Sequence, residues 1–378
     1  MTKFKTTLLA MAVSAAAFSV QAAQVSLYGS VSTGVLYQNQ ASLSGGTENQ
    51  ESKDSFTMES GFWGDSIWGI TGEEDLGNGW TVGFTLENGF DSDTGKMTGG
   101  SVLFDSQAYL RIGNDKVNFA FGNIGGLASA GGDFDLLCAF DPMEAFVDVA
   151  GLGAFASKDF ASGNMAVVEV TPMEGFKVSL MANAGDEDDN ARWSDRNHYY
   201  GVGLSYENGP LALAGIAEMR KYNSQAGWGA NDDTDSWTFT VAAAYDFEVV
   251  RPSFVYQHVS KSREFASEAV ESNDAYNYDS FMLGATAPLG QGTLRATVQY
   301  VKGENEYDSK DEASATIFGL AYTYDMSKRT ALYAGAYYSI GGDGLDKDLS
   351  TGETEYSGGM TRTDYNSFGL GLGLVHTF

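Results

Sequence analysis

The residues that could support hydrolytic chemistry are three histidines, His198, His258 and His376, which lie far apart in the sequence. A hydrolase needs an imidazole beside a nucleophile and a carboxylate at one site. The best local arrangement is His258 with Ser260 two residues later, on the same face of a strand. A histidine at such a position is usually a surface residue. We therefore expect no catalytic site and no enzymatic activity.

Acidic clusters are the second group with chemical potential, because carboxylate oxygens bind hard cations such as Ca²⁺ and Mg²⁺. Two clusters occupy 186–189 and 232–233, and the segment that begins at Asp91 resembles a calcium loop. In that segment Gly95 comes one place early, and Val102 stands where the terminal Glu belongs. A single cysteine excludes disulfides and Cys-based metal centres. We expect solvated loop tips without a resident metal or cofactor, and the alternative is divalent bridging to lipopolysaccharide.

A third group of acidic residues lies in the stretch 124–163, the longest segment without a regular hydrophobic pattern. Its only basic residue is Lys158. The acidic positions are Asp133, Asp135, Asp141, Glu144, Asp148 and Asp159. A connection of this length inside a compact domain usually has a function. The alternative is a solvated acidic surface loop.

The composition of the whole chain excludes several classes of protein. Its 378 residues include 50 acidic and 22 basic ones, which gives a formal net charge of −28. Nucleic-acid affinity depends on Lys and Arg that neutralise phosphates, so we expect no nucleic-acid partner. The 47 glycines argue against a helix-rich fold, and the 13% aromatic content with only 5 prolines argues against disorder.

The elements that would position these residues are β-strands, because hydrophobicity alternates with a period of two. Trp237, Phe239 and Val241 alternate with Thr238 and Thr240, so one face is apolar and the other is polar or small. Runs of about 9–13 residues suit tilted membrane strands. The expected strands are 24–38, 60–73, 80–90, 101–113, 117–123, 164–171, 175–184, 197–207, 210–220, 236–247, 250–261, 277–287, 291–303, 313–325, 329–340 and 363–378.

Short turns alternate with long connections between these strands, and the long ones include 39–59 and 124–163. This plan predicts an all-β fold: a closed, 16-stranded antiparallel transmembrane β-barrel with short periplasmic turns and long extracellular loops. Closure satisfies the backbone groups that lipid cannot hydrate.

The first residues, 1–22, have the pattern of a secretory signal peptide. Lys3 and Lys5 precede an apolar core from Leu8 to Phe18, and Ala22 provides a small residue at the cleavage site. The core is too short for a membrane-spanning helix of about 20 residues. We expect an exported chain whose mature part, 23–378, forms one barrel domain.

Several motifs resemble the Gram-negative general porins, in particular those of β-proteobacterial type. They are the opening strand Gln24–Gly29, the strand and turn Ser66–Gly79, the triplet Gln107–Tyr109, and the ending His376–Phe378 with its terminal aromatic. The resemblance covers nearly the whole mature chain. It implies a homotrimer of barrels in the outer membrane, in contact with lipid and lipopolysaccharide, and a water-filled channel for passive diffusion of small hydrophilic solutes and ions. His376 and Phe378 would form the C-terminal assembly signal.

The resemblance also implies that the third long loop, 124–163, folds into the barrel and forms the constriction. Asp133, Asp135, Asp141, Glu144 and Asp148 would then set the electric field of the eyelet. The wall departs from the family pattern, because Ile67, Ser106 and Asn123 stand where basic residues are common. The charged residues expected on the inner face are Arg111, Lys177, Arg295, Glu87 and Glu169. We therefore expect cation selectivity.

One alternative is a solute-specific channel, since Tyr199, Tyr333 and Tyr337 are expected on the inner face. A barrel adhesin or enzyme is a weaker alternative, because it would need a convergent cluster at one rim.

Overall fold

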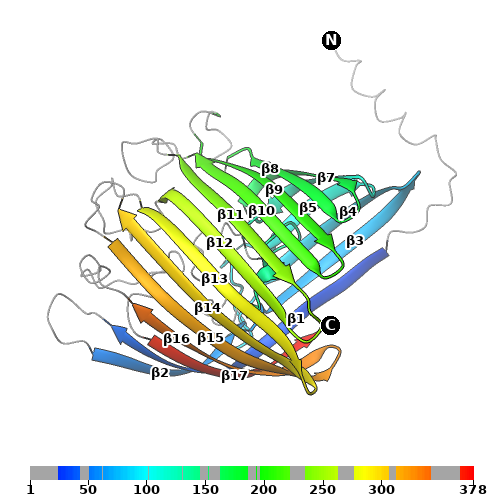
Figure 1. The fold of residues 1–378 in the computed structure, drawn as a ribbon. Helices are drawn as coiled ribbons and strands as arrows, with labels where there is room; N and C mark the ends of the chain where they lie inside the picture. Colours follow the sequence, from blue (N-terminus) through cyan, green and yellow to red (C-terminus); the bar gives the residue numbers. More distant parts are fainter. Residues whose placement is uncertain are drawn as a thin grey trace, which may run out of the picture.

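The computed structural model describes residues 24–42, 51–61, 63–100, 102–129, 131–144, 152, 162–185, 193, 196–221, 235–262, 276–305, 312–341 and 367–378 (Figure 1). The expected signal segment, the acidic clusters at 186–189 and 232–233, Asp148 and Asp159 lie outside these residues. Among the described residues, no helix has the length and hydrophobicity required to cross a membrane.

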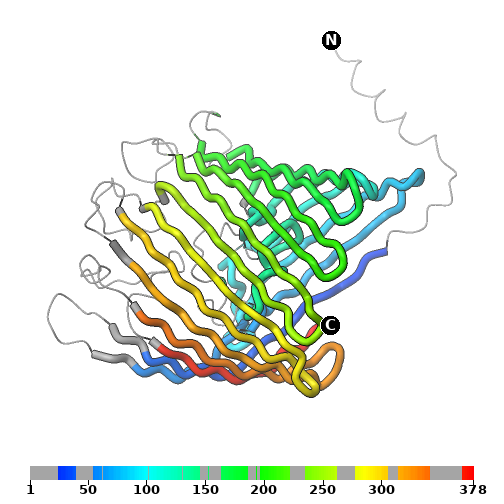
Figure 2. Tube along the Cα trace, viewed as in Figure 1, coloured from blue at the N-terminus to red at the C-terminus, as the bar shows by residue number. Residues whose placement is uncertain are grey.

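The strands form one antiparallel sheet that closes on itself (Figures 1 and 2). Apart from the second and third strands, which show no ladder with each other in the described residues, each strand pairs with its neighbours in the chain, and β1 (Gln24–Ser42) also pairs with β17 (Ser367–Thr377), which closes the barrel. Both β2 (Glu51–Ser60) and β3 (Ile67–Gly77) pair with the same edge of β1, one above the other. They therefore occupy one position in the wall, and the barrel has sixteen positions, as predicted.

The remaining strands follow in chain order around the wall. They are β4 (Trp80–Gly89), β5 (Gln107–Gly113), β6 (Val117–Ile124), β7 (Ser162–Met173), β8 (Phe176–Asn183), β9 (His198–Asn208), β10 (Leu211–Lys221), β11 (Ser236–Tyr245), β12 (Arg251–Ser262), β13 (Tyr276–Leu289), β14 (Gly292–Asn305), β15 (Glu312–Ser327) and β16 (Thr330–Gly341).

The two faces of the wall differ as the alternating pattern requires. On β11, Phe239 is 48% exposed on the outside, whereas its neighbour Thr240 is 1% exposed on the inside. On β17, Leu370, Leu372 and Leu374 are exposed on the outer face. An apolar outer band and a polar or small inner face are the arrangement expected of a barrel in lipid.

Three expected boundaries are wrong. The strand expected at 60–73 runs instead from Ile67 to Gly77. The predicted connection 39–59 is largely strand, because β2 pairs with the upper part of β1 and places Phe56 and Met58 opposite Tyr37 and Val35. Charged residues at 51, 53, 54 and 59 obscure the alternating hydrophobic pattern of this strand in the sequence.

The strand predicted from residue 101 begins only at Gln107. The carboxylate of Asp105 accepts hydrogen bonds from the Gly89 amide at 3.0 Å, the Asn88 side chain at 2.9 Å and the Thr98 hydroxyl at 2.6 Å. These bonds hold the chain before Gln107 in a loop rather than in the sheet.

Candidate pore constriction

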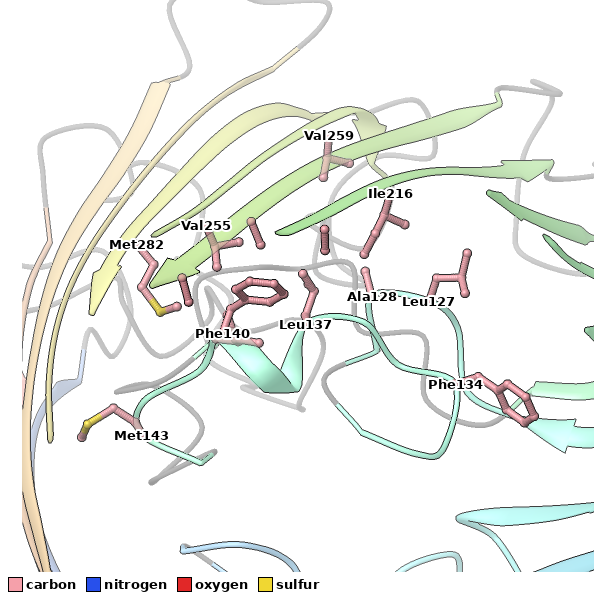
Figure 3. Packing of buried hydrophobic residues seen from close by; sticks show 14 of the residues in the cluster. Leu127, Ala128, Phe134, Leu137, Phe140, Met143, Ile216, Val255, Val259 and Met282 are labelled. Atoms are coloured by element: carbon pink, nitrogen blue, oxygen red, sulfur yellow. The ribbon is translucent and has the colours of Figure 1, made fainter. Parts of the chain in front are cut away.

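The segment after β6 lies inside the barrel and packs against its inner wall (Figure 3). Its apolar side chains Leu127, Leu137, Phe140 and Met143 are buried. The wall residues buried in the same cluster include Ile216, Val255 and Met282. Burial of apolar surface holds the segment to the wall. Residues 125–129 and 131–144 belong to the predicted loop 124–163, and this described part folds inward as the resemblance implies.

The start of this loop is fixed by two inward side chains. The Leu127 amide donates to the Tyr199 hydroxyl at 3.1 Å, and the Ala128 amide donates to the Glu218 carboxylate at 3.3 Å. The Tyr199 hydroxyl itself donates to Glu218 at 2.5 Å. Buried backbone amides need hydrogen-bond acceptors. Side chains of β9 and β10 supply these acceptors in place of a neighbouring strand.

The middle of the loop is fixed through Asp133. Its amide donates to the side-chain oxygen of Gln107 at 3.0 Å, and its carboxylate accepts a hydrogen bond from the Tyr109 hydroxyl. Gln107 also donates to Glu87 at 3.5 Å, and Glu87 accepts from the Tyr28 hydroxyl at 2.9 Å. The structure thus joins Asp133 of the loop and Glu87 of the wall through one hydrogen-bonded group.

Two further loop carboxylates shape the loop itself. Asp135 accepts hydrogen bonds from the amides of Leu137 and Cys138 at 2.9 and 2.6 Å, at the start of a short 3₁₀ turn, Cys138–Phe140. Asp141 accepts from the Met143 amide at 2.9 Å. Side-chain capping of this kind replaces missing backbone partners.

The end of the described loop meets two arginines of the opposite wall. Arg251 donates to the carbonyl of Ala139 at 2.9 Å, and Arg295 donates to the carbonyl of Pro142 at 3.0 Å. Arg295 Nη1 also lies 2.7 Å from Glu144 Oε1. Strands β12 and β14 therefore hold residues 139–144. The described part of the loop thus contacts the wall at its start, its middle and its last residues.

Two wall glycines leave room for this close packing. A Cβ at Gly203 would lie 2.5 Å from Leu136 Cδ1, and a Cβ at Gly284 would lie 2.4 Å from Pro142 Cγ. A side chain at Gly284 would displace the rigid Pro142 ring and with it the loop, whereas one at Gly203 would require the Leu136 side chain to move.

The other predicted wall cations are also paired. Arg111 Nη2 lies 2.6 Å from Glu73 Oε2, and Lys177 Nζ lies 3.0 Å from Glu169 Oε1. Glu169 also accepts from Asn118 at 3.0 Å. With the Arg295–Glu144 pair, each of the three predicted wall cations therefore faces a carboxylate.

Sequence reasoning missed three charged residues of the inner wall: Arg251 and Glu218, which bind the loop, and Glu73, which pairs with Arg111. Alternation was a signal for all three, since each lies at an inward-facing position of its strand. The sequence gives no signal for the partner of each one.

The aromatic and histidine candidates are engaged in other contacts. Tyr199, Tyr333 and Tyr337 are inward but buried, so their rings are not open to a solute. His258 lies 2.9 Å from Asp279 on the outer face rather than acting on Ser260. Among the described residues, no group of three or more His, Cys, Asp or Glu side chains could hold a metal ion.

The C-terminal residues lie at the seam of the barrel. The Phe378 amide donates to the Gly29 carbonyl at 3.0 Å, and the Gly29 amide donates back at 3.3 Å. His376 Nδ1 lies 2.9 Å from the Thr330 hydroxyl. Their role as an assembly signal stays a prediction.

Comparisons with known proteins agree with this architecture. A family model described as Gram-negative porin matches residues 6–372. An outer membrane porin protein of Bordetella pertussis is 29% identical over 89% of this chain and 94% of its own length. Outer membrane porin protein 32 of Delftia acidovorans is 28% identical over 99% of this chain and all of its own.

Solved structures share the fold. An anion-selective porin from Comamonas acidovorans has a TM-score of 0.67 at 21% identity, and it matches 94% of this chain and 100% of its own. Salmonella typhi OmpF has a TM-score of 0.66 at 15% identity, with 94% of this chain and 97% of its own covered.

Proposed function

Because the chain belongs to the Gram-negative porins of the outer membrane, we propose that it is a general diffusion channel whose constriction is the loop 125–144. The observation that carries this proposal is the loop's position, inside a closed barrel and bonded to opposite parts of the wall. A loop fixed in this way narrows a water-filled barrel to an eyelet without closing it. The channel then selects solutes by size and charge.

Swelling of liposomes that contain the protein tests this function. Uptake of neutral sugars of increasing size should fall smoothly with size, since only the eyelet limits diffusion. Saturable uptake of one sugar would instead indicate a solute-specific channel. The burial of Tyr199, Tyr333 and Tyr337 favours the general channel, because a specific sugar path requires exposed ring faces.

We further propose that the channel prefers cations. Arg111, Lys177 and Arg295 each lie within 3.0 Å of a carboxylate oxygen, which cancels much of the field of the wall cations. The Arg111–Glu73 pair is about half-exposed, and a pair of this kind contributes only about 0–1 kcal/mol to stability. Glu87 and Asp133 add negative charge beside the loop. The Comamonas structure is titled anion-selective, and at 21% identity it supports the fold alone.

We also propose a homotrimer embedded in outer-membrane lipid and lipopolysaccharide. Support comes from the outer face, where large apolar side chains such as Leu27, Phe239 and Leu372 are exposed in the single chain. Part of that surface would contact lipid and part a neighbouring subunit. The mass of the detergent-solubilised protein should be three times that of the chain, and a monomeric mass would contradict the trimer.

A further inference from the structure

The wall of the barrel is interrupted between β2 and β3, where Gly61 and residues 63–66 lie outside the sheet. The interruption is held by Ser32 of β1, whose amide donates to the Ser66 hydroxyl at 3.0 Å and whose carbonyl accepts from the Gly61 amide at 3.1 Å. The Ser32 hydroxyl donates to the Trp63 carbonyl at 2.8 Å. These bonds replace the missing strand contacts, so the interruption has a defined conformation.

The side chain of Trp63 lies inside the barrel, where it is 3% exposed. Its ring stacks on Tyr333 of β16, with centroids 5.7 Å apart and planes inclined by 20°. The guanidinium carbon of Arg295 lies 5.2 Å from the centre of the Trp63 ring. A planar cation over an aromatic face is attracted to it, and more strongly where water is scarce. The Arg295 side chain is 14% exposed.

The same guanidinium reaches the third loop. Arg295 Nη1 contacts the Glu144 carboxylate at 2.7 Å and the Pro142 carbonyl at 3.0 Å. The interruption contributes a second contact, because the Gly64 amide donates to the Glu144 carbonyl at 3.3 Å. Trp63 and Glu144 therefore both contact one arginine, and each comes from a different irregular segment.

We propose that Trp63, Arg295 and Glu144 form a latch that fixes the 142–144 segment of the constriction loop. In this arrangement Arg295 is a positioning residue: the stacked Trp63 orients its guanidinium, and the guanidinium holds the loop. The inference rests on the proposed channel function. It adds that the break between β2 and β3 has a role, since it places Trp63 beside the arginine that holds this segment.

Substitutions can distinguish an Arg295 that anchors the loop from an Arg295 that acts only as a positive charge in the lumen. Arg295→Lys keeps the positive charge but loses the planar guanidinium that lies over the Trp63 ring. Trp63→Ala changes no charge in the lumen. If Arg295 acted only through its charge, both variants would conduct as the original protein does. If Arg295 acts as part of a latch, both variants would free residues 142–144 of the loop, and the ion current through the constriction would fluctuate.

The experiment is single-channel recording of Trp63→Ala and Arg295→Lys in planar bilayers. We expect the fraction of time spent in reduced-conductance levels to rise roughly tenfold in each, as expected when one partly desolvated cation–π contact is lost. The double variant should add little, because both changes remove the same contact. Trp237→Ala is the control, since Trp237 is exposed on the outer face. Retention of the heat-modifiable gel mobility of a folded barrel verifies folding of each variant.

The outcomes separate the two proposals. Steady currents in both folded variants, equal to those of the original protein, would overturn the latch and leave the channel intact. Absence of channels from the original protein would overturn the proposed function itself. If Trp63→Ala does not fold, the more conservative Trp63→Phe is recorded, and steady currents in it and in Arg295→Lys would likewise overturn the latch.

Discussion

At the scale of single residues, the loop carboxylates combine structural and electrostatic roles. Asp135 and Asp141 cap backbone amides of the loop, Asp133 holds Tyr109, and Glu144 pairs with Arg295. Each of these side chains therefore shapes the loop and also places an acidic group inside the barrel. The sequence predicts the acidic group, but it gives no signal for which amide or arginine each member meets.

Cys138 gives a direct probe of the loop's position. It is an exposed residue at the 3₁₀ turn of a loop that lies inside the barrel. A cationic methanethiosulfonate reagent should attach there and reduce single-channel conductance, because it adds bulk and positive charge to a cation path. The Cys138→Ala protein should show no change. An unaltered conductance in fully modified protein would contradict the placement of the loop at the constriction.

The rate of that modification should depend strongly on pH. Cys138 is accessible to a reagent, but the protein atoms around it displace part of the water from the thiol. This desolvation, together with the charges of Asp135 and Asp141, raises the pKa of Cys138 above its usual range. The thiolate is the reactive form, so a raised pKa lowers the rate at neutral pH. The rate should climb about tenfold per pH unit from 7 to 9 without a plateau. A plateau within that range, measured by mass spectrometry, would show that these surroundings do not raise the pKa of the thiol.

At the scale of elements, periodicity predicts the strands well and their interruptions poorly. β11 and β17 are recognisable because apolar residues fall at every second position. The break between β2 and β3 is not, because Trp63 belongs to neither strand and its partners Tyr333 and Arg295 are more than two hundred residues away. Contacts across the barrel depend on strand register and curvature, which the sequence of one strand does not contain.

The fit between loop and wall can be tested at Gly284. The Gly284→Val side chain would overlap Pro142, and overpacking of this kind costs about 1–3 kcal/mol. The strained contact should push the loop toward the middle of the channel and lower its conductance. Gly215→Val is the matched control, because a Cβ at Gly215 meets no atom within 4 Å. Equal conductance in the two folded variants would show that the loop does not rest on this wall.

At the scale of the whole molecule, closure and charge explain the composition. The pairing of β1 with β17 closes the barrel, and the outer face is largely apolar. Most of the formal charge of −28 is therefore expected in the lumen and at the rims. Described acids such as Glu73, Glu87 and Glu169 face inward, where they oppose or exceed the nearby basic groups. Alternation in the sequence predicts the inward position of Glu87 and Glu169, whereas the pairing of each wall cation is visible only in the folded barrel.

The reversal potential of single channels in a KCl gradient tests the central claim most directly. Discrete current steps would establish an open channel, and the potential at zero current reports which ion passes more easily. The inward acids and paired wall cations predict a potassium preference, with the dilute side positive at zero current. Discrete steps with the dilute side negative would mean that chloride passes more easily, and this result would contradict the proposed cation-selective constriction.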